Sequence, residues 1–90
     1  MSLTEKHFKA FREGIKRARL IREDLKKTLT EYNPKKVRGL NKAYIETIKQ
    51  VITHGELYLD YERKNLQRGI KVAITIENYR AFLSSLEKNK

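Results

Sequence analysis

The sequence is poor in the residues that cross-link a chain or carry it through a membrane. It contains no cysteine, no tryptophan and only one proline among 90 residues. Without cysteine, disulfides, thiolate-bound metals and cysteine nucleophiles are excluded. No apolar stretch approaches the roughly 20 residues that span a bilayer, and the charged N-terminal sequence has no signal-peptide core. We therefore expect a cytoplasmic protein with no membrane segment, folded as one domain over residues 1–90.

Motifs of specific chemistry are also missing. The sequence has no glycine-rich phosphate loop, no nucleophile elbow and no pair of acids spaced for general acid–base work. Its two histidines, His7 and His54, lack the i+4 histidine or the neighbouring thiolates expected of a transition-metal site. We expect no enzyme activity, no metal and no cofactor, and we interpret both histidines as surface or interface residues.

Positive charge is the strongest feature of the composition. Lysine and arginine total 21 against 11 acidic residues, which gives a formal net charge of +10 and a pI near 10.0. A domain this basic is typical of nucleic-acid binding, although anionic membranes and acidic proteins attract the same charge. The charge therefore selects a class of partner and leaves the partner itself open.

A first long helix is predicted up to Tyr32, where Pro34 follows closely and stops it. Ser2 and Glu5 fit a capping box at its start, and Gly14 weakens it by about 1 kcal/mol relative to alanine. Apolar residues then recur at alternating three- and four-residue steps, as a buried helix face requires. This seam consists of Phe8, Phe11, Ile15, Ala18, Leu25, Leu29 and Tyr32.

A second long helix is predicted over residues 36–68, closed by Gly69. Its evidence is an apolar seam with a seven-residue repeat, which we expect to be buried together. The repeat consists of Ile45, Ile52, Leu59 and Leu66. Gly55 in its middle, and a second possible capping box over residues 53–56, leave open a break into two shorter helices.

A β-hairpin is the rival interpretation of the region 57–75. Apolar residues alternate with polar ones in two short runs, as in half-buried strands. The runs consist of Leu57, Leu59 and Tyr61, and of Ile70, Val72 and Ile74. The connection between them has no Asn-Gly or Asp-Gly turn, which disfavours the hairpin. The alternative fold is a helical domain with a β-wing at about 57–75.

A short C-terminal helix is predicted after Thr75, which offers an N-cap. Its apolar face consists of Tyr79, Phe82, Leu83 and Leu86. The predicted fold class is therefore all-α, with two long helices forming an antiparallel hairpin and a short helix closing it. A first helix of about 45 Å exceeds the diameter of a small domain, about 30 Å. Because Leu20 and Ile21 lie off its seam, we expect them to serve a homodimer interface.

Cations are concentrated on the first helix and in the predicted turn after it. On the helix, Lys9, Arg12, Lys16, Arg19 and Lys26 recur at helical spacing away from the apolar seam. The segment 34–42, interpreted as a turn beside a helix N-terminus, adds Lys35, Lys36, Arg38 and Lys42 with no acid. An ordinary solvated helix face is the plainer interpretation of the first set.

The function that this distribution favours is binding of DNA or RNA. We expect a small accessory or regulatory protein that contacts the phosphate backbone with little sequence preference. These nine cations are the predicted contacts. The alternative is a helical protein–protein interaction module, an adaptor or inhibitor whose basic surface meets an acidic partner protein.

Overall fold

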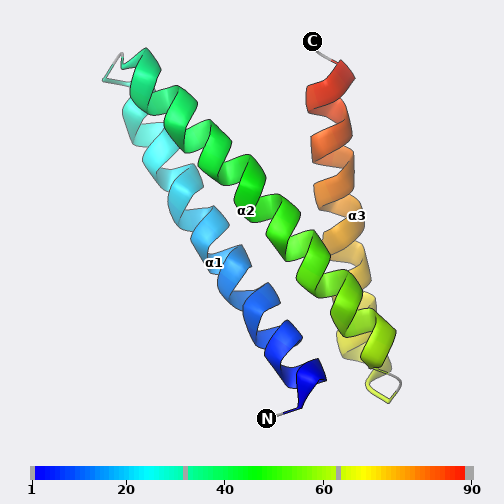
Figure 1. Ribbon diagram of the computed structural model, residues 1–90. Helices are drawn as coiled ribbons and strands as arrows, with labels where there is room; N and C mark the ends of the chain where they lie inside the picture. Colours follow the sequence, from blue (N-terminus) through cyan, green and yellow to red (C-terminus); the bar gives the residue numbers. More distant parts are fainter. Residues whose placement is uncertain (1, 32, 63, 89–90) are drawn as a thin grey trace.

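Three α-helices make up the described chain (Figure 1). The computed structural model describes residues 2–31, 33–62 and 64–88. Helix α1 comprises Leu3–Leu29, α2 comprises Pro34–Tyr61, and α3 comprises Leu66–Lys88. No β-strand occurs in these ranges. The all-α prediction is confirmed, and the β-wing at about 57–75 is wrong.

Helix α1 begins as predicted and ends early. Ser2 is its N-cap, and the serine hydroxyl oxygen accepts a hydrogen bond from the Glu5 amide at 3.2 Å. The helix ends at Leu29 because the next two amides donate to carbonyls three positions back, which tightens the last turn. The predicted end, Tyr32, lies outside the described residues.

Helix α2 starts inside the segment that we predicted to be a turn. The Asn33 side-chain oxygen accepts from the Lys36 amide at 3.2 Å, so Asn33 is the N-cap. Pro34 follows in the first turn, where its missing amide hydrogen costs nothing and its fixed φ suits a helix. Residues 34–42 are therefore helical, and the predicted turn there is wrong.

Helix α2 ends at Tyr61, before the end predicted at residue 68. The Glu62 carboxylate accepts hydrogen bonds from the amides of Lys64, at 2.9 Å, and Asn65, at 3.2 Å. These two bonds hold the pKa of Glu62 below its ordinary value, since they stabilise the charged form. These hydrogen bonds stabilise a turn after Tyr61, so the helix ends there although the apolar repeat continues to Leu66.

Helix α3 starts at Leu66, well before the predicted cap. The Asn65 side-chain oxygen accepts from the Arg68 amide at 3.0 Å, as an N-cap does. Thr75 lies mid-helix and its hydroxyl donates to the carbonyl oxygen four residues earlier, at 3.0 Å. The predictions that Gly69 closes a helix and that Thr75 opens one are both wrong. At 23 residues, α3 is the shortest of the three described helices.

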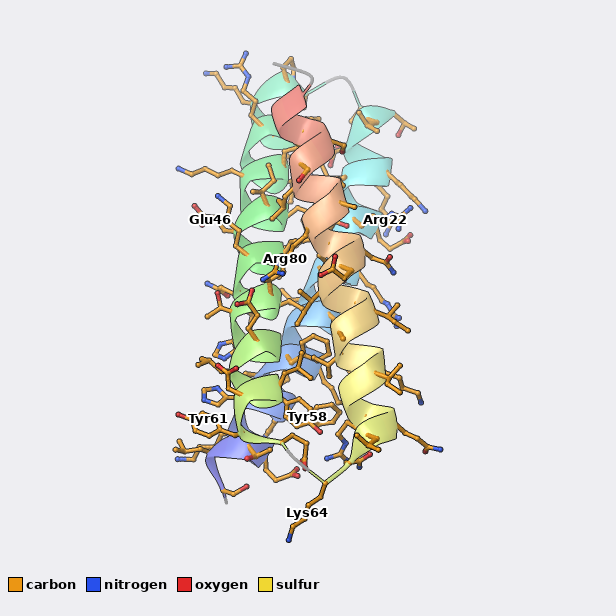
Figure 2. The ribbon with its side chains drawn as sticks, turned by 90° about the vertical axis from the view of Figure 1, so that its right-hand side faces the viewer. Arg22, Glu46, Tyr58, Tyr61, Lys64 and Arg80 are labelled. Carbon is orange, nitrogen blue, oxygen red and sulfur yellow. The ribbon has the colours of Figure 1, made fainter. Side chains whose placement is uncertain are left out.

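The two long helices lie antiparallel side by side, and α3 folds back over them (Figures 1 and 2). Gly55 is continuous with the rest of α2, so the possible break there does not occur. A Cβ atom at Gly55 would lie 2.9 Å from Ile76 of α3 and 3.0 Å from Phe11 of α1. The bare glycine lets all three helices converge. The buried core consists of Phe11, Ile48, Val51, Ile52, Tyr58, Val72 and Ile76.

The predicted apolar seams are only partly buried. In the seven-residue repeat, Ile52 is buried and Ile45 and Leu59 are half-buried. Leu66 belongs to α3 and is 77% exposed, so the prediction that all four are buried together is wrong. In α1, Leu29 is 63% exposed, because the helix ends there.

The molecule is elongated and flat. Its principal extents are 48 × 29 × 17 Å, with a radius of gyration of 14.8 Å. A compact 90-residue domain has a radius of gyration of about 12 Å. Among the described residues, no helix combines the length and apolar character needed to cross a membrane.

Candidate nucleic-acid interface

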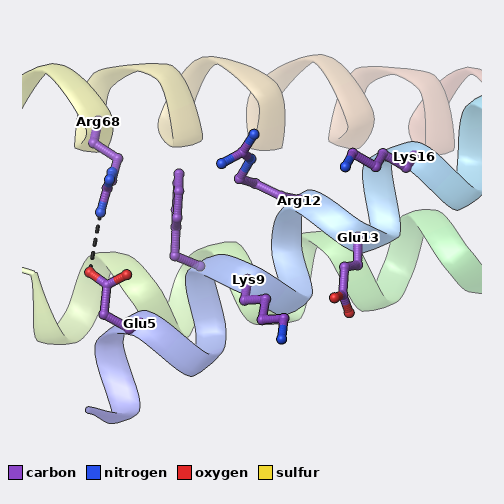
Figure 3. Close-up of a pocket in the computed structure, with 7 residues that line it drawn as sticks. Glu5, Lys9, Arg12, Glu13, Lys16 and Arg68 are labelled. Carbon is purple, nitrogen blue, oxygen red and sulfur yellow. Dashed lines mark hydrogen bonds and ion pairs between the residues drawn. The ribbon is translucent and has the colours of Figure 1, made fainter. Parts of the chain in front are cut away.

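An open groove lies where the first half of α1 faces the start of α3 (Figure 3). Its volume is about 380 Å³. We call it the α1–α3 groove. It is lined by Glu5, Phe8, Lys9, Arg12, Glu13, Lys16 and Arg68. It thus contains the first three cations of the predicted set together with an arginine that the sequence did not single out.

The Phe8 ring organises the guanidinium groups of the groove. The Arg68 guanidinium carbon lies 4.2 Å from the centre of this ring, and that of Arg12 lies 5.9 Å from it. Arginine cations at such distances are attracted by the ring quadrupole. Tyr58 of α2 packs against Phe8 from the core, with ring centres 5.0 Å apart. The ring is therefore fixed, and two arginines from different helices gather over it.

Arg68 is also held by an acid of α1. Its guanidinium nitrogen lies 3.3 Å from the Glu5 carboxylate, with both side chains partly exposed. In Figure 3 this pair joins the start of α3 to the first turns of α1. Sequence reasoning missed Arg68 because its place depends on the chain reversal before α3. The one local signal was Asn65, a good N-cap three residues earlier.

Positive charge predominates in the groove. The cations Lys9, Arg12, Lys16 and Arg68 outnumber the acids Glu5 and Glu13. Within the described ranges, only Arg68 of these cations has a carboxylate within 4.0 Å. Figure 3 shows Arg12 extending from α1 towards α3 and Lys16 lying along the groove, whereas Lys9 points away from α3. These long exposed side chains can therefore meet an anion that enters between the two helices.

The basic row continues along α1 beyond the groove. Burial raises the pKa of Tyr79 of α3, and the positive charges of Arg19 and Arg22 on α1 partly offset this increase. Lys26, the last predicted cation on α1, lies 3.6 Å from Glu23. The row on α1 thus extends past the groove, with its last member partly neutralised.

The predicted cations of the second segment lie elsewhere. Tyr58 of α2 packs against Phe8, which lines the groove. Lys35 lies roughly 35 Å from Tyr58 along the axis of α2. Figure 2 shows Glu46 on the outer edge of α2, with Arg22 of α1 on the opposite edge. Lys42 is one turn before Glu46 on the same face. The structure therefore does not bring this second set, Lys35, Lys36, Arg38 and Lys42, to the groove.

Individual members of this second set differ in their surroundings. Lys36 lies 3.8 Å from the Glu31 carboxylate across the α1–α2 connection. Arg38 lines an apolar pocket of about 490 Å³ with Leu29, Pro34 and Val37. The second set is thus a separate basic surface at the other end of the helical hairpin.

The two histidines meet across the α1–α2 interface, although 47 positions separate them. Their Nδ1 atoms lie 3.4 Å apart, and the His7 ring stacks on Tyr61. The prediction that they are surface or interface residues is confirmed, since both are half-buried between helices. No group of three or more metal-ligating side chains occurs in the described part of the chain. A hydrogen-bonded pair accounts for the short distance between the rings.

The chemistry of the groove is that of anion binding. Arginine offers a planar fork of donors that matches phosphate or carboxylate oxygens, and lysine adds a mobile point charge. No protein family, curated protein or solved structure matches this chain. The groove and the charge around it are therefore the features of the molecule that point to a function.

Proposed function

We propose that this protein binds the sugar–phosphate backbone of DNA or RNA through the α1–α3 groove and the basic row of α1. The observation that carries the proposal is the gathering of Arg12 and Arg68 over Phe8, beside Lys9 and Lys16. Two helices supply these groups, so their spacing is held by the fold. Backbone contacts of this kind give affinity without reading sequence.

The length of the basic row supports a polymer ligand over a single anion. From Lys9 to Arg19 the row covers about 15 Å of helical rise, several times the axial rise of about 3.4 Å per phosphate on one strand of B-form DNA. A single bound phosphate would use only the cations nearest Phe8. We therefore expect consecutive phosphates of one strand to lie along α1.

Fluorescence anisotropy with labelled duplex and single-stranded oligonucleotides of mixed sequence tests this proposal. The affinity should fall with rising salt by about 0.9 log units per log unit of salt for each duplex phosphate neutralised. Reversing three cations, in the variant Arg12→Glu, Lys16→Glu and Arg19→Glu, should abolish binding. All three side chains are exposed, so circular dichroism should show an unchanged helical fold.

The matched control reverses three exposed cations outside the predicted set, in the variant Arg17→Glu, Lys49→Glu and Lys64→Glu. Both variants change the net charge equally, so the control should retain most of the affinity if position matters. Equal loss in both would show that only the net charge attracts the ligand. If the parent binds neither duplex nor single strand at about 50 mM salt, the proposal is wrong and an acidic protein partner takes its place.

A further inference from the structure

Helix α3 carries apolar side chains on two opposite faces. Val72 and Ile76 point inward and are buried in the core. Leu66, Ile70 and Ile74 follow each other at four-residue steps on the other side, and they are 77%, 59% and 56% exposed. Residues four apart are neighbours on a helix surface, so these three form one continuous row. We call them the α3 outer row.

The outer row continues into an apolar hollow beside it. The hollow has a volume of about 260 Å³ and lies between the end of α2 and the start of α3. Leu66 and Ile70 form one wall, while Leu59, Gly69 and Ala73 contribute the remaining apolar surface. Two polar residues, Glu62 and Asn65, stand at its margin. Single exposed leucines are normal on monomeric proteins, whereas the outer row and the hollow together form one continuous apolar surface.

The face of α3 around the outer row carries little net charge. Over residues 66–86, the exposed charged side chains are Lys71, Glu77 and Arg80. Arg80 forms ion pairs with Glu56 of α2 and with Glu77. The whole chain has a net charge of +10. When this face of one copy packs against the same face of a second copy, most of the positive charge lies outside the contact. Electrostatic repulsion between the two copies is then small.

The isolated chain exposes more surface than its mass predicts. Its accessible surface is 7006 Å². A compact monomer of 10.7 kDa exposes about 5,500 Å² by the usual scaling of area with mass. The excess, about 1,500 Å², exceeds the roughly 800 Å² per partner that a standard specific interface buries. The elongated chain therefore has surface enough for one standard interface.

We propose that two copies of this chain associate through the α3 outer row. The two α3 helices pack antiparallel about a two-fold axis that passes near Ile70. Leu66 of one copy then faces Ile74 of the other, and the two Ile70 side chains meet at the axis. A two-fold interface must complement itself, and a row of three similar aliphatic side chains does so when reversed. Burial of these side chains is the driving force.

This interface differs from the one predicted from sequence. Leu20 is 67% exposed, but it lies on α1 among exposed charged side chains of both signs, such as Lys16 and Asp24. Ile21 is already half-buried within the single chain. A contact through Leu20 would bury these charged neighbours, whereas the outer row is a continuous apolar surface. The outer row also lies apart from the proposed phosphate-binding groove, since Arg68 turns inward over Phe8.

Analytical ultracentrifugation of three proteins tests the proposal: the parent, Ile70→Glu and Leu20→Glu. The concentration range is about 1 µM to about 0.5 mM, which covers dimers with micromolar and weaker dissociation constants. We expect the parent and Leu20→Glu to form dimers and Ile70→Glu to remain a monomer with unchanged helix content. The two variants change charge equally, so a difference between them reports the location of the contact. A parent that stays monomeric throughout this range overturns the proposal.

Cysteine cross-linking tests the axis directly, because the chain has no cysteine of its own. Ile70→Cys should form a disulfide-linked dimer under mild oxidation, since residues at the axis come within the 3.5–4.5 Å Cβ separation that a disulfide requires. Leu20→Cys is the control and should remain mainly monomeric. Equal cross-linking of the two variants, or cross-linking of Leu20→Cys alone, would overturn the proposed interface.

Discussion

Gly14 of α1 lies directly against Val51 of α2. A Cβ atom built on Gly14 would come within 2.5 Å of the Val51 Cγ2 atom. Val51 is fully buried and β-branched, so its side chain has little freedom to move aside. The glycine that weakens α1 as an isolated helix is therefore the residue that lets the two long helices approach closely.

Replacing Gly14 by alanine should destabilise the protein despite the better helix propensity. Propensity favours alanine by about 1 kcal/mol, but overpacking a tight contact costs about 1–3 kcal/mol. We expect a net loss of about 1 kcal/mol and a lower melting temperature by several degrees. Gly39→Ala is the matched control, since nothing lies within 4 Å of its added Cβ atom. That variant should melt higher than the parent. A stabilised Gly14→Ala variant would contradict the close contact.

Introducing a charge at Ile52, in the apolar seam of α2, should strongly destabilise the protein. Ile52 is 9% exposed, so Ile52→Asp places an unpaired carboxylate among apolar side chains. We expect a loss of several kcal/mol in chemical denaturation, enough to unfold a domain of this size. Leu20→Asp, at a side chain that is 67% exposed, should change stability by well under 1 kcal/mol. Similar losses in the two variants would place Ile52 at the surface.

Releasing Arg68 from its acidic partner should strengthen nucleic-acid binding. Glu5→Gln removes the carboxylate that lies 3.3 Å from the Arg68 guanidinium, leaving that group free for phosphate. We expect affinity to rise a few-fold, with the salt dependence steeper by about 0.9 for one further duplex phosphate. Glu13→Gln is the control, because Glu13 lines the same groove without an ion pair to Arg68. Equal gains in both variants would mean that Arg68 takes no part.

The turn between α2 and α3 should become less stable at acidic pH. The pKa of Glu62 is lowered by the hydrogen bonds it accepts from the Lys64 and Asn65 amides. A depressed pKa in the folded state means that the stabilisation is present above the unfolded-state pKa, about 4.3. It is lost as pH falls through the lower folded-state value.

Thermal melts of the parent and Glu62→Gln from neutral pH to about pH 3 measure this effect. The variant should be less stable than the parent at neutral pH, and the difference should shrink below about pH 4.3. Glu46→Gln, an exposed site on α2, controls for the change of net charge. A gap between parent and Glu62→Gln that is constant over this range would show that the carboxylate does not stabilise the turn.

Local signals in the sequence determined most of the secondary structure. Ser2 caps α1 as its spacing with Glu5 predicts, and Pro34 separates the two long helices. Such features act through neighbouring backbone atoms, so they can be recognised without the fold. The predicted continuation of the second helix to residue 68 is wrong because the seven-residue repeat runs through the junction between α2 and α3. A cap at Asn65 outweighs that repeat.

The charge and spacing of the α1 cations were also visible in the sequence, because helical periodicity fixes which residues share a face. Only the tertiary structure decided which other groups lie beside that face. Arg68 joins Arg12 over Phe8 because the chain reverses after Tyr61, and His7 meets His54 because α1 and α2 pack in one register. Contacts between distant residues depend on how helix faces pack. Glycines such as Gly14 and Gly55 set that packing through the volume they leave empty.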